Sequence, residues 1–335
     1  MKKKIVIINK EKIFKKDNNF FCDNVDIKTI PEGLGKNFDV SVIAAKSNIE
    51  RSHKINLQNI KLTSNVFNFL ISIFKTFKYK ETSYLIISIT PYSFFAYLLL
   101  FFFRKKIFIY IRSNGYEEYK AILGFLGPLI YFIMYKTVTF KSKIISCQKR
   151  LVKKEHDLVF PSELDNNWMK DDTKPPMDKP RLLYVGRIKI EKGIFSLLKI
   201  LDKINKDLTL SILGKDENHE INNKKVNVIG FEQNITSLID TYDNHNIIIL
   251  PSYTEAHPKV VDESLSRARP VIIFEEINHI IQNRHGVFVS RREAKSLNET
   301  IEFIMNNYSS IQEKIKKNQL PTKKKFISEI NRILS

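Results

Sequence analysis

Short apolar runs alternate with helix-length amphipathic stretches through the first half of the chain. The apolar runs predict strands at residues 4–8, 40–43, 85–89, 107–111 and 143–146. Helical segments separate them, and this alternation is typical of a parallel sheet with helices on both faces. The first half is therefore predicted to be an α/β domain, over residues 1–160.

A second series of the same kind follows a change in composition. Strands are predicted at 181–185, 209–213, 226–229, 247–250 and 271–274, and helices at 193–205, 235–242 and 257–269. Residues 161–180 are rich in proline and charge and lack a core pattern, so we expect a linker there. The second domain is expected over 181–320, followed by a C-terminal helix within 321–335, with Thr322 as its N-cap.

The composition suits two folded domains. A chain of 335 residues with 43% hydrophobic residues can bury two cores, which excludes disordered, collagenous and small disulfide-rich classes. Cys22 and Cys147 are too few for a disulfide framework, so we expect a reducing, cytoplasmic compartment. The apolar run near the start has four residues, which is short for a signal peptide.

The positive charge is concentrated in the first half. The net charge is +19; residues 1–160 hold 28 Lys and Arg against 12 Asp and Glu, and residues 161–335 hold 27 against 24. In the first half these cations flank very apolar stretches, a combination that suits the anionic face of a bilayer. A genome rich in Lys, Ile, Asn and Phe codons is the alternative explanation.

Residues 83–103 form 21 consecutive positions without charge, which is long enough for a membrane-spanning helix. Against this interpretation, the β-branched run 85–89 ends at Thr90-Pro91, and a cationic break at 104–106 precedes the next strand. Strand, helix and strand are therefore favoured, with the spanning helix as the alternative.

The segment after the strand at 247–250 carries candidate chemistry. A short loop presents Glu255, and Pro258 stands at the start of the predicted helix. The first amides of that helix, from Lys259 and Val260 onward, would form an anion site for a diphosphate. Glu255 and Glu263 are acceptors that suit sugar and ribose hydroxyls, although both could be surface charges.

A second candidate loop follows the strand at 181–185. Gly186 allows a tight turn, Arg187 and Lys192 lie on the loop, and Gly193 opens the next helix. Two cations at the carboxyl end of a strand can neutralise a diphosphate leaving group. Alone, such a loop is usually a solvated turn; together with the Glu255 loop it is much more specific.

At these residues the chain resembles retaining nucleotide-sugar glycosyltransferases of the GT-B fold, glycosyltransferase family 4. The family's Gly-Arg...Lys-Gly loop is similar to Gly186-Arg187 with Lys192-Gly193, and its Pro-Ser...Glu-x7-Glu element is similar to Pro251-Ser252 with Glu255 and Glu263. The Pro-Val-Ile at 270–272, the pre-linker stretch 159–165 and the turn Gly230-Phe231 also fit the family. The resemblance covers residues 159–275.

The resemblance implies a fold and a set of roles. The fold would be two Rossmann-like doubly wound domains that face a cleft, with a C-terminal helix able to pack back on the first domain. Arg187 and Lys192 would bind the diphosphate, Glu263 the ribose and Glu255 the transferred sugar. The expected catalytic residues are Arg187, Lys192 and Glu255. The expected donor-binding residues are Gly186, Arg187, Lys192, Gly230, Phe231, Glu255, His257, Pro258, Lys259, Val260 and Glu263.

The first domain departs from the family pattern. No glycine follows the first strand before Gly33, which leaves donor contacts from loop 9–22 open, and no histidine lies between His53 and His156. Arg112 and Asn114, at a predicted strand end, are candidates for acceptor binding, with a purely structural role as the alternative. His257 could equally cap a helix.

The resemblance implies a retaining transfer from a donor of the UDP or GDP type. We expect this transfer to be metal-independent, because no Asp-x-Asp motif occurs. No cofactor is expected. The acceptor would be a lipid-linked or oligosaccharide precursor of lipopolysaccharide, O-antigen or capsule, reached from the cytoplasm by peripheral association with the inner face of the cell membrane. An integral membrane protein and a basic nucleic-acid-binding protein are the alternatives, although no nucleic-acid-binding module is visible.

Overall fold

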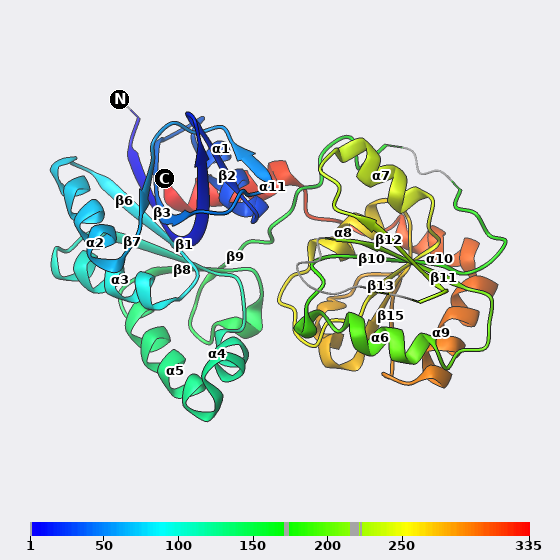
Figure 1. Ribbon diagram of the computed structural model, residues 1–335. Helices are drawn as coiled ribbons and strands as arrows, with labels where there is room; N and C mark the ends of the chain where they lie inside the picture. The colour runs from blue at the N-terminus through cyan, green and yellow to red at the C-terminus, as the bar shows by residue number, and fades with distance from the viewer. Residues whose placement is uncertain (1, 171–173, 215–220, 222) are drawn as a thin grey trace. The chain divides into compact units, whose positions relative to one another are not determined.

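The computed structural model describes residues 2–170, 174–214, 221 and 223–335 (Figure 1). The chain divides into two compact units, Met1–Pro161 with Lys324–Ser335, and Ser162–Lys323. Each is a mixed α/β unit, and each is described here by itself.

The first unit is built on a sheet of nine strands among the described residues. Its parallel strands run in the order β5-β3-β1-β6-β7-β8-β9, and β2 and β4 extend it with antiparallel pairing. The strands are β1 (Lys4–Lys16), β2 (Asn19–Cys22), β3 (Asp39–Ser47), β4 (His53–Ile55), β5 (Ile60–Thr63), β6 (Thr82–Ile87), β7 (Lys106–Ile111), β8 (Lys143–Ser146) and β9 (Asp157–Leu158).

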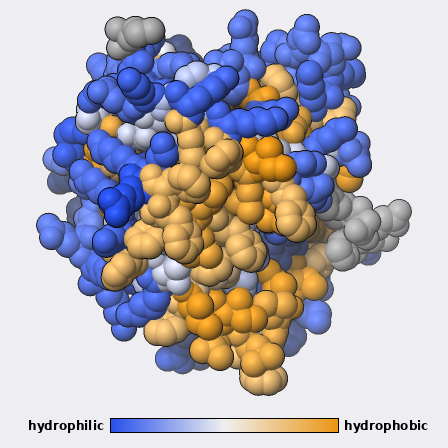
Figure 2. All heavy atoms as spheres, turned by 90° about the vertical axis from the view of Figure 1, so that its left-hand side faces the viewer, coloured by the Kyte–Doolittle hydropathy of each residue, from blue (hydrophilic) through white to orange (hydrophobic). Residues whose placement is uncertain are grey.

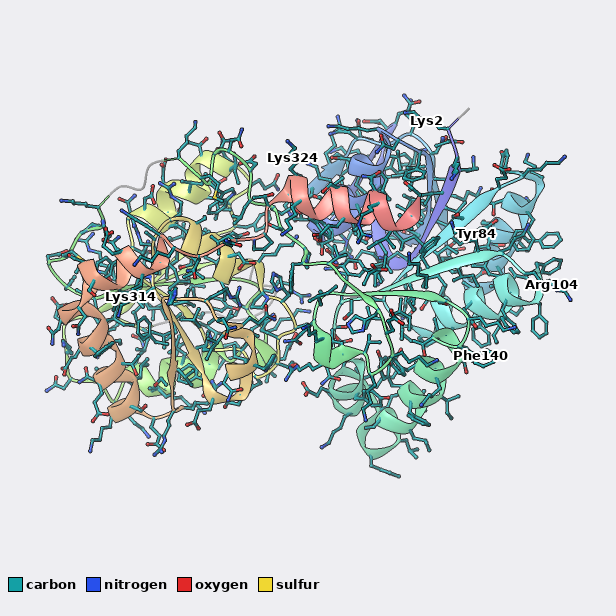
Figure 3. All side chains as sticks on the ribbon, turned by 180° about the vertical axis from the view of Figure 1, so that it is seen from behind. Lys2, Tyr84, Arg104, Phe140, Lys314 and Lys324 are labelled. Atoms are coloured by element: carbon teal, nitrogen blue, oxygen red, sulfur yellow. The ribbon has the colours of Figure 1, made fainter. Side chains whose placement is uncertain are left out.

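Helices cover both faces of this sheet (Figure 1). They are α1 (Val25–Leu34), α2 (Val66–Phe74), α3 (Pro91–Phe102), α4 (Gly115–Leu123), α5 (Gly127–Val138) and α11 (Lys323–Leu334), with short 3₁₀ turns at Lys75–Lys78, Gly124–Leu126 and Lys149–Leu151. The side chains of Phe69, Tyr97 and Met134 pack on the apolar strand residues and close the core. Tyr84 of β6, labelled in Figure 3, is buried in the same core.

The segment expected as loop 9–22 is instead a hairpin of strands. β1 continues to Lys16 after a register shift between Ile8 and Lys12, and Phe14 pairs with Phe21 of β2. The prediction of a loop was wrong because residues 10–16 are mostly Lys and Glu on a largely exposed strand in which Ile13 alone is buried, so that no continuous apolar run marks it.

The uncharged stretch 83–103 does not form a spanning helix. It contains most of β6, a break at Ser88–Thr90 and α3, whose start Thr90 caps through the amide of Ser93. One other stretch, Gly115–Val138, is long and apolar enough to cross a membrane. It turns back at Gly124, where φ is +64°, and α4 packs against α5 with the Tyr116 and Tyr131 rings 4.8 Å apart. The two helices therefore form a hairpin (Figure 1).

The second unit has six parallel strands among its described residues, in the order β12-β11-β10-β13-β14-β15. They are β10 (Arg181–Val185), β11 (Thr209–Leu213), β12 (Val226–Gly230), β13 (Ile247–Leu250), β14 (Val271–Phe274) and β15 (Val287–Ser290). The winding reverses between β10 and β13. In open α/β sheets ligands bind beyond the carboxyl ends of the strands at such a reversal.

The helices of this unit are α6 (Ile194–Leu201), α7 (Ile235–Asp243), α8 (Lys259–Ser266), α9 (Ala294–Asn306) and α10 (Tyr308–Ile315), with 3₁₀ turns at Ile190–Lys192 and Glu275–Ile280. The strand β15 and the helices α9 and α10 are not among the elements predicted from the sequence. Part of the expected linker, 171–173, lies outside the described residues. The rest is not a free linker, because Leu164 and Trp168 are buried in the core of the second unit, isolated apolar residues that no periodicity could reveal.

The helix α11 packs on the first unit. Phe326 and Ile330 are buried there, and the Phe326 ring lies 6.4 Å from that of Tyr110. The helix also contacts the edge of the unit, where Lys3 Nζ donates to the carbonyl oxygen of Ser335 at 3.0 Å. In Figure 3, Lys324 marks its start.

Candidate functional site

The candidate site lies at the reversal of the second sheet, where β10 and β13 end side by side. Residues 186–193 follow β10 and residues 251–258 follow β13. These are the two loops that the sequence analysis singled out. The winding of the sheet brings them together because both strands are short, parallel and directly paired.

The first loop is shaped by its own strand. The buried Tyr184 hydroxyl donates to the carbonyl oxygen of Arg187 at 2.7 Å, so that the loop folds back over β10. Gly186 has φ +153°, and its carbonyl oxygen would lie 1.9 Å from a Cβ on Gly214. The Arg187 side chain is exposed to solvent at this turn. The loop thus presents the Arg187 guanidinium to solvent beside the backbone of residues 186 and 214.

The two loops are held together by close contacts. The amide of Tyr253 donates to the carbonyl oxygen of Glu191 at 3.0 Å. Gly193 has φ +71°, and a Cβ on it would lie 1.9 Å from the Pro251 carbonyl oxygen. Only glycine combines this backbone conformation with so close an approach. The loops therefore form one surface.

Lys192 and Glu255 meet across this surface. The Lys192 ammonium lies 2.5 Å from Glu255 Oε1, with 21% and 13% of the two side chains exposed. Ser252 Oγ donates to the same carboxylate oxygen at 2.8 Å. His279 Nε2 lies 2.8 Å from the Glu255 carbonyl oxygen, which fixes the loop from behind. A partly exposed cation and a positioned carboxylate are thereby held side by side.

The helix α8 starts beside Glu255. Its N-cap is Pro258, whose side chain cannot satisfy the first amides, which include those of Lys259 and Val260. The Lys259 ammonium lies 3.2 Å from Glu163 Oε1, so its charge is already partly balanced. What this helix start offers an anion is mainly backbone N–H and dipole.

Glu263 lies one turn into α8. Its Oε2 accepts a hydrogen bond of 2.8 Å from the Tyr242 hydroxyl. Burial raises the pKa of Glu263 above the usual value for glutamate, although the Tyr242 hydrogen bond and Lys259 oppose the rise. Burial makes the charged form of this carboxylate unfavourable in the unbound chain, and hydrogen bonds from ligand hydroxyls would stabilise that form.

We expect Glu263→Gln to stabilise the second unit at neutral pH. Because the pKa of Glu263 is raised in the folded state, this group's contribution to the free energy of unfolding is fully present below its unfolded-state pKa. The contribution is lost as the pH rises through the folded-state pKa. The melting temperature of the variant should exceed that of wild type at about pH 7 and match it at about pH 4. Thermal unfolding at the two pH values measures this.

Glu302→Gln is the matched control with the opposite sign. Hydrogen bonds from Lys206 and Asn298 lower the pKa of Glu302, so its loss should destabilise the unit at neutral pH. Equal melting temperatures of Glu263→Gln and wild type at neutral pH would contradict the assigned burial.

His257 is positioned rather than exposed. Its Nε2 lies 2.8 Å from Asp262 Oδ2, both side chains are almost fully buried, and Asp262 Oδ1 also binds Arg284. The ring therefore ties the loop to α8. Its predicted contact with the donor stays a prediction.

Gly230 ends β12, on the other side of the first loop, and Phe231 follows it. The Gly230 carbonyl oxygen accepts from the Gly214 amide at 2.7 Å, and Phe231 is 47% exposed. With Gly186, these glycines place three backbone turns at the ends of β10, β11 and β12. An exposed aromatic ring beside such turns can stack on a planar group.

Arg292 is a site residue that the sequence analysis missed. Its Nη2 donates to the Pro251 carbonyl oxygen at 3.0 Å, its Nε donates to Glu276 at 2.7 Å, and its guanidinium lies 4.2 Å from the Tyr253 ring centroid. It thereby braces the Glu255 loop from the end of β15. No motif marks it, since the contact arises only in the folded sheet.

In the first unit, Arg112 lies at the end of β7. Its guanidinium pairs with the buried Asp26 of α1. It lines two neighbouring cavities, of about 300 Å³ and about 280 Å³, at the reversal between β1 and β6. Asn114 Nδ2 donates to Glu117 Oε1 at 2.8 Å at the start of α4. Arg112 is thus well placed for a ligand of this unit, and Asn114 supports the helix start.

Within the described residues, no group of three His, Cys, Asp or Glu side chains could hold a metal ion. Metal independence stays a prediction.

The part of the chain that contains these loops matches a known protein family. Residues 165–322 match the family described as Glycosyl transferases group 1. The chain is 23% identical to the capsular polysaccharide biosynthesis glycosyltransferase CapM of Staphylococcus aureus, over 88% of each chain. It is 25% identical, over 38% of its own length, to a Bacillus subtilis protein named as the teichuronic acid biosynthesis glycosyltransferase TuaC, and that match spans about a third (33%) of the relative.

The fold is also that of solved glycosyltransferases. Anabaena HepE, solved with UDP and glucose, superimposes with a TM-score of 0.69 at 11% identity, over 99% of both chains. Such low identity carries the fold alone.

Proposed function

Residues 165–322 belong to the glycosyl transferases group 1, and on this premise we propose that the chain, which has the GT-B fold, transfers a sugar from a nucleoside diphosphate to a hydroxyl group of a bacterial surface polysaccharide precursor. The observation that carries the proposal is the pairing of Lys192 with Glu255 at 2.5 Å across the two loops of the second unit. The names of CapM and TuaC support a polysaccharide acceptor.

The donor is assigned to the second unit. Arg187, Lys192 and the first amides of α8 would bind the diphosphate, since two cations and a helix start can share its charge. Glu263 would accept hydrogen bonds from the ribose hydroxyls, and Phe231 would border the base. The donor base, UDP or GDP, is left to the experiment.

The proposed reaction retains the configuration at the anomeric carbon. The bond from this carbon to the phosphate oxygen breaks, and the acceptor oxygen forms its new bond on the same face. The acceptor hydroxyl passes its proton to the departing phosphate oxygen, whose charge Arg187 and Lys192 stabilise. Glu255 orients the sugar and, like every other protein group, forms no covalent bond to it. The step needs no metal or cofactor.

The acceptor is assigned to the first unit. Arg112 is held by Asp26 and lines cavities beside the register shift of β1 and the ends of β6 and β7. A cation fixed in this way suits an acceptor that carries hydroxyl, carboxylate or phosphate groups.

Thermal stabilisation by nucleotides tests the donor site. A nucleoside diphosphate at about 100 times its Kd should add about 2.7 kcal/mol to the free energy of unfolding. UDP, GDP and their sugars are compared by the shift in melting temperature. We expect one base to stabilise wild type and Arg187→Ala to lose most of that shift, because the exposed guanidinium is available to the diphosphate.

Arg181→Ala is the control, since Arg181 lies at the amino end of the same strand, β10. Its variant should keep the full shift. No stabilisation of wild type by any nucleotide or nucleotide sugar would contradict the proposed function.

A further inference from the structure

An apolar surface covers one side of the first unit. Figure 2 shows it as a continuous orange area, on the side where α2, α3 and α5 lie in Figure 1. Its most exposed side chains are Phe67, Phe102, Ile122, Phe125, Leu129 and Phe140, between 57% and 87% exposed. We call this surface the apolar face. Soluble proteins rarely expose so many large side chains together unless a partner covers them.

The helices of the apolar face are hydrophobic on both sides. In α2, Phe69 and Ile73 are buried, whereas Phe67, Ile71 and Phe74 on the other side are at least half exposed. A helix packed on a sheet in water normally has a polar outer side. The apolar side chains on the outer side of α2 therefore suit an apolar environment, and packing on the sheet does not explain their presence.

Cations accompany this surface. Between residues 66 and 143 the sequence has eleven Lys or Arg and three Asp or Glu. The ammonium groups of Lys105, Lys136 and Lys141 lie 4.5, 5.5 and 5.8 Å from the ring centroids of Phe77, Phe132 and Phe101. Arg104 and Phe140, both labelled in Figure 3, are exposed to solvent. Apolar side chains bordered by cations match a layer of acyl chains below anionic headgroups.

The α4–α5 hairpin limits how deeply the surface can enter a bilayer. Residues 121–135 carry no charge, and Phe125 at the turn is 87% exposed. Lys120 precedes the turn at Gly124 by four residues, about 6 Å of helix. Lys136 stands near the far end of α5. With Lys120 kept among the headgroups, the tip reaches about 5–10 Å, the depth of an interfacial helix and well short of a span.

The hairpin also forms a wall of a cavity. The cavity of about 280 Å³ has Arg112, Ser88 and Lys10 on its polar side and Tyr119, Ile122 and Tyr131 on its hairpin side. Ile122 is also 73% exposed on the apolar face. An amphiphile whose tail lies in a bilayer beside the hairpin would have its polar head at this cavity.

From these observations we propose that the apolar face docks on an anionic lipid bilayer, with the α4–α5 hairpin inserted at headgroup depth, so that the Arg112 cavity takes the head of a lipid-linked acceptor from the membrane surface. The acceptor part of this statement rests on the proposed function, whereas the docking does not. A second copy of the chain is a poor occupant, because facing copies would bring the same cations together.

Vesicle binding tests the docking with the full chain. Wild type should bind vesicles of phosphatidylcholine with about a third phosphatidylglycerol, bind pure phosphatidylcholine far less, and detach as salt is raised. Phe125→Ser should weaken binding about tenfold or more, since burying one such side chain contributes about 1.5–3 kcal/mol. Phe303→Ser, which removes a 55% exposed ring from α9 in the second unit, should bind like wild type.

Insertion is measured separately. The fluorescence of Phe125→Trp should be quenched by lipids brominated in the acyl chain, whereas that of Phe303→Trp should not; the buried Trp168 gives the common background. Equal binding of Phe125→Ser and wild type, or an unquenched Phe125→Trp, overturns the proposal. So does a concentration-dependent dimer in sedimentation that Phe125→Ser dissociates, or preferential binding to duplex DNA.

The acceptor part has its own readout. Phe125→Ser should keep the wild-type melting shift with the donor nucleotide, and should lose transfer to a lipid-linked acceptor in vesicles while keeping transfer to a short soluble one. Loss of both transfers with an intact melting shift would overturn the link between the hairpin and a lipid-borne acceptor. Failure of the proposed function looks different: vesicle binding would persist, and no nucleotide would stabilise the chain.

Discussion

Lys192→Ala is expected to lower kcat/KM for sugar transfer by about 10²- to 10³-fold, the usual cost of removing one group that stabilises a developing negative charge. The Lys192 ammonium is held 2.5 Å from Glu255 on a surface that two loops build together. Because this contact already positions the ammonium in the absence of a ligand, the ammonium can stabilise the charge on a departing diphosphate without reorganisation. Transfer from the stabilising nucleotide sugar, followed by product formation, measures the effect.

Lys199→Ala is the matched control, because this exposed lysine lies on α6 of the same unit, away from both loops. It should leave transfer unchanged. Glu255→Gln should differ from Lys192→Ala by keeping nucleotide binding while transfer falls, since the new side-chain amide oxygen can still accept from Ser252 and Lys192 but carries no negative charge. A Lys192→Ala enzyme with near-normal kcat/KM would refute the assignment of the leaving-group site.

Gly193→Ala is expected to destabilise the second unit by about 2–4 kcal/mol and to abolish nucleotide binding. The residue has φ +71°, and a Cβ would lie 1.9 Å from the Pro251 carbonyl oxygen. The clash involves backbone, so one of the two loops must move. Either movement separates Lys192 from Glu255. Thermal unfolding with and without nucleotide measures both losses.

Gly230→Ala separates steric from conformational cost. Gly230 also has positive φ, at +92°, but no atom lies within 4 Å of the Cβ position. Its variant should therefore lose only about 1–2 kcal/mol, the backbone cost. Equal melting temperatures for the two variants would show that the loops are less closely joined than described.

Strands buried on both faces were predictable from sequence. The strands at Arg181–Val185, Thr209–Leu213 and Lys143–Ser146 coincide with the expected residues, because each is a short, mostly buried and largely apolar stretch between polar joints. The extension of β1 was not, since it is largely exposed and rich in Lys, and β15 is a strand of four residues whose three apolar positions are all partly exposed. Tertiary pairing, which the local pattern does not encode, decides these strands.

The residues of the candidate site also differ in how far they could be predicted from the sequence. The loops around Lys192 and Glu255 were predictable from the resemblance to a family, and the structure brings these two residues together. The bracing roles of Tyr184, His279 and Arg292 were not predictable, because each acts through a contact with a backbone carbonyl that depends on the folded course of the loops. Sequence spacing identifies residues that face a ligand more readily than those that hold them.

The return of α11 to the first unit affects how the protein is made. Phe326, Ile330 and Leu334 complete the core of that unit, yet the ribosome synthesises them after the whole of Ser162–Lys323. The unit that carries the apolar face thus emerges early and stays unfinished while its neighbour folds. Nascent chains should therefore expose the apolar face to chaperones until α11 has been synthesised and has packed on the first unit.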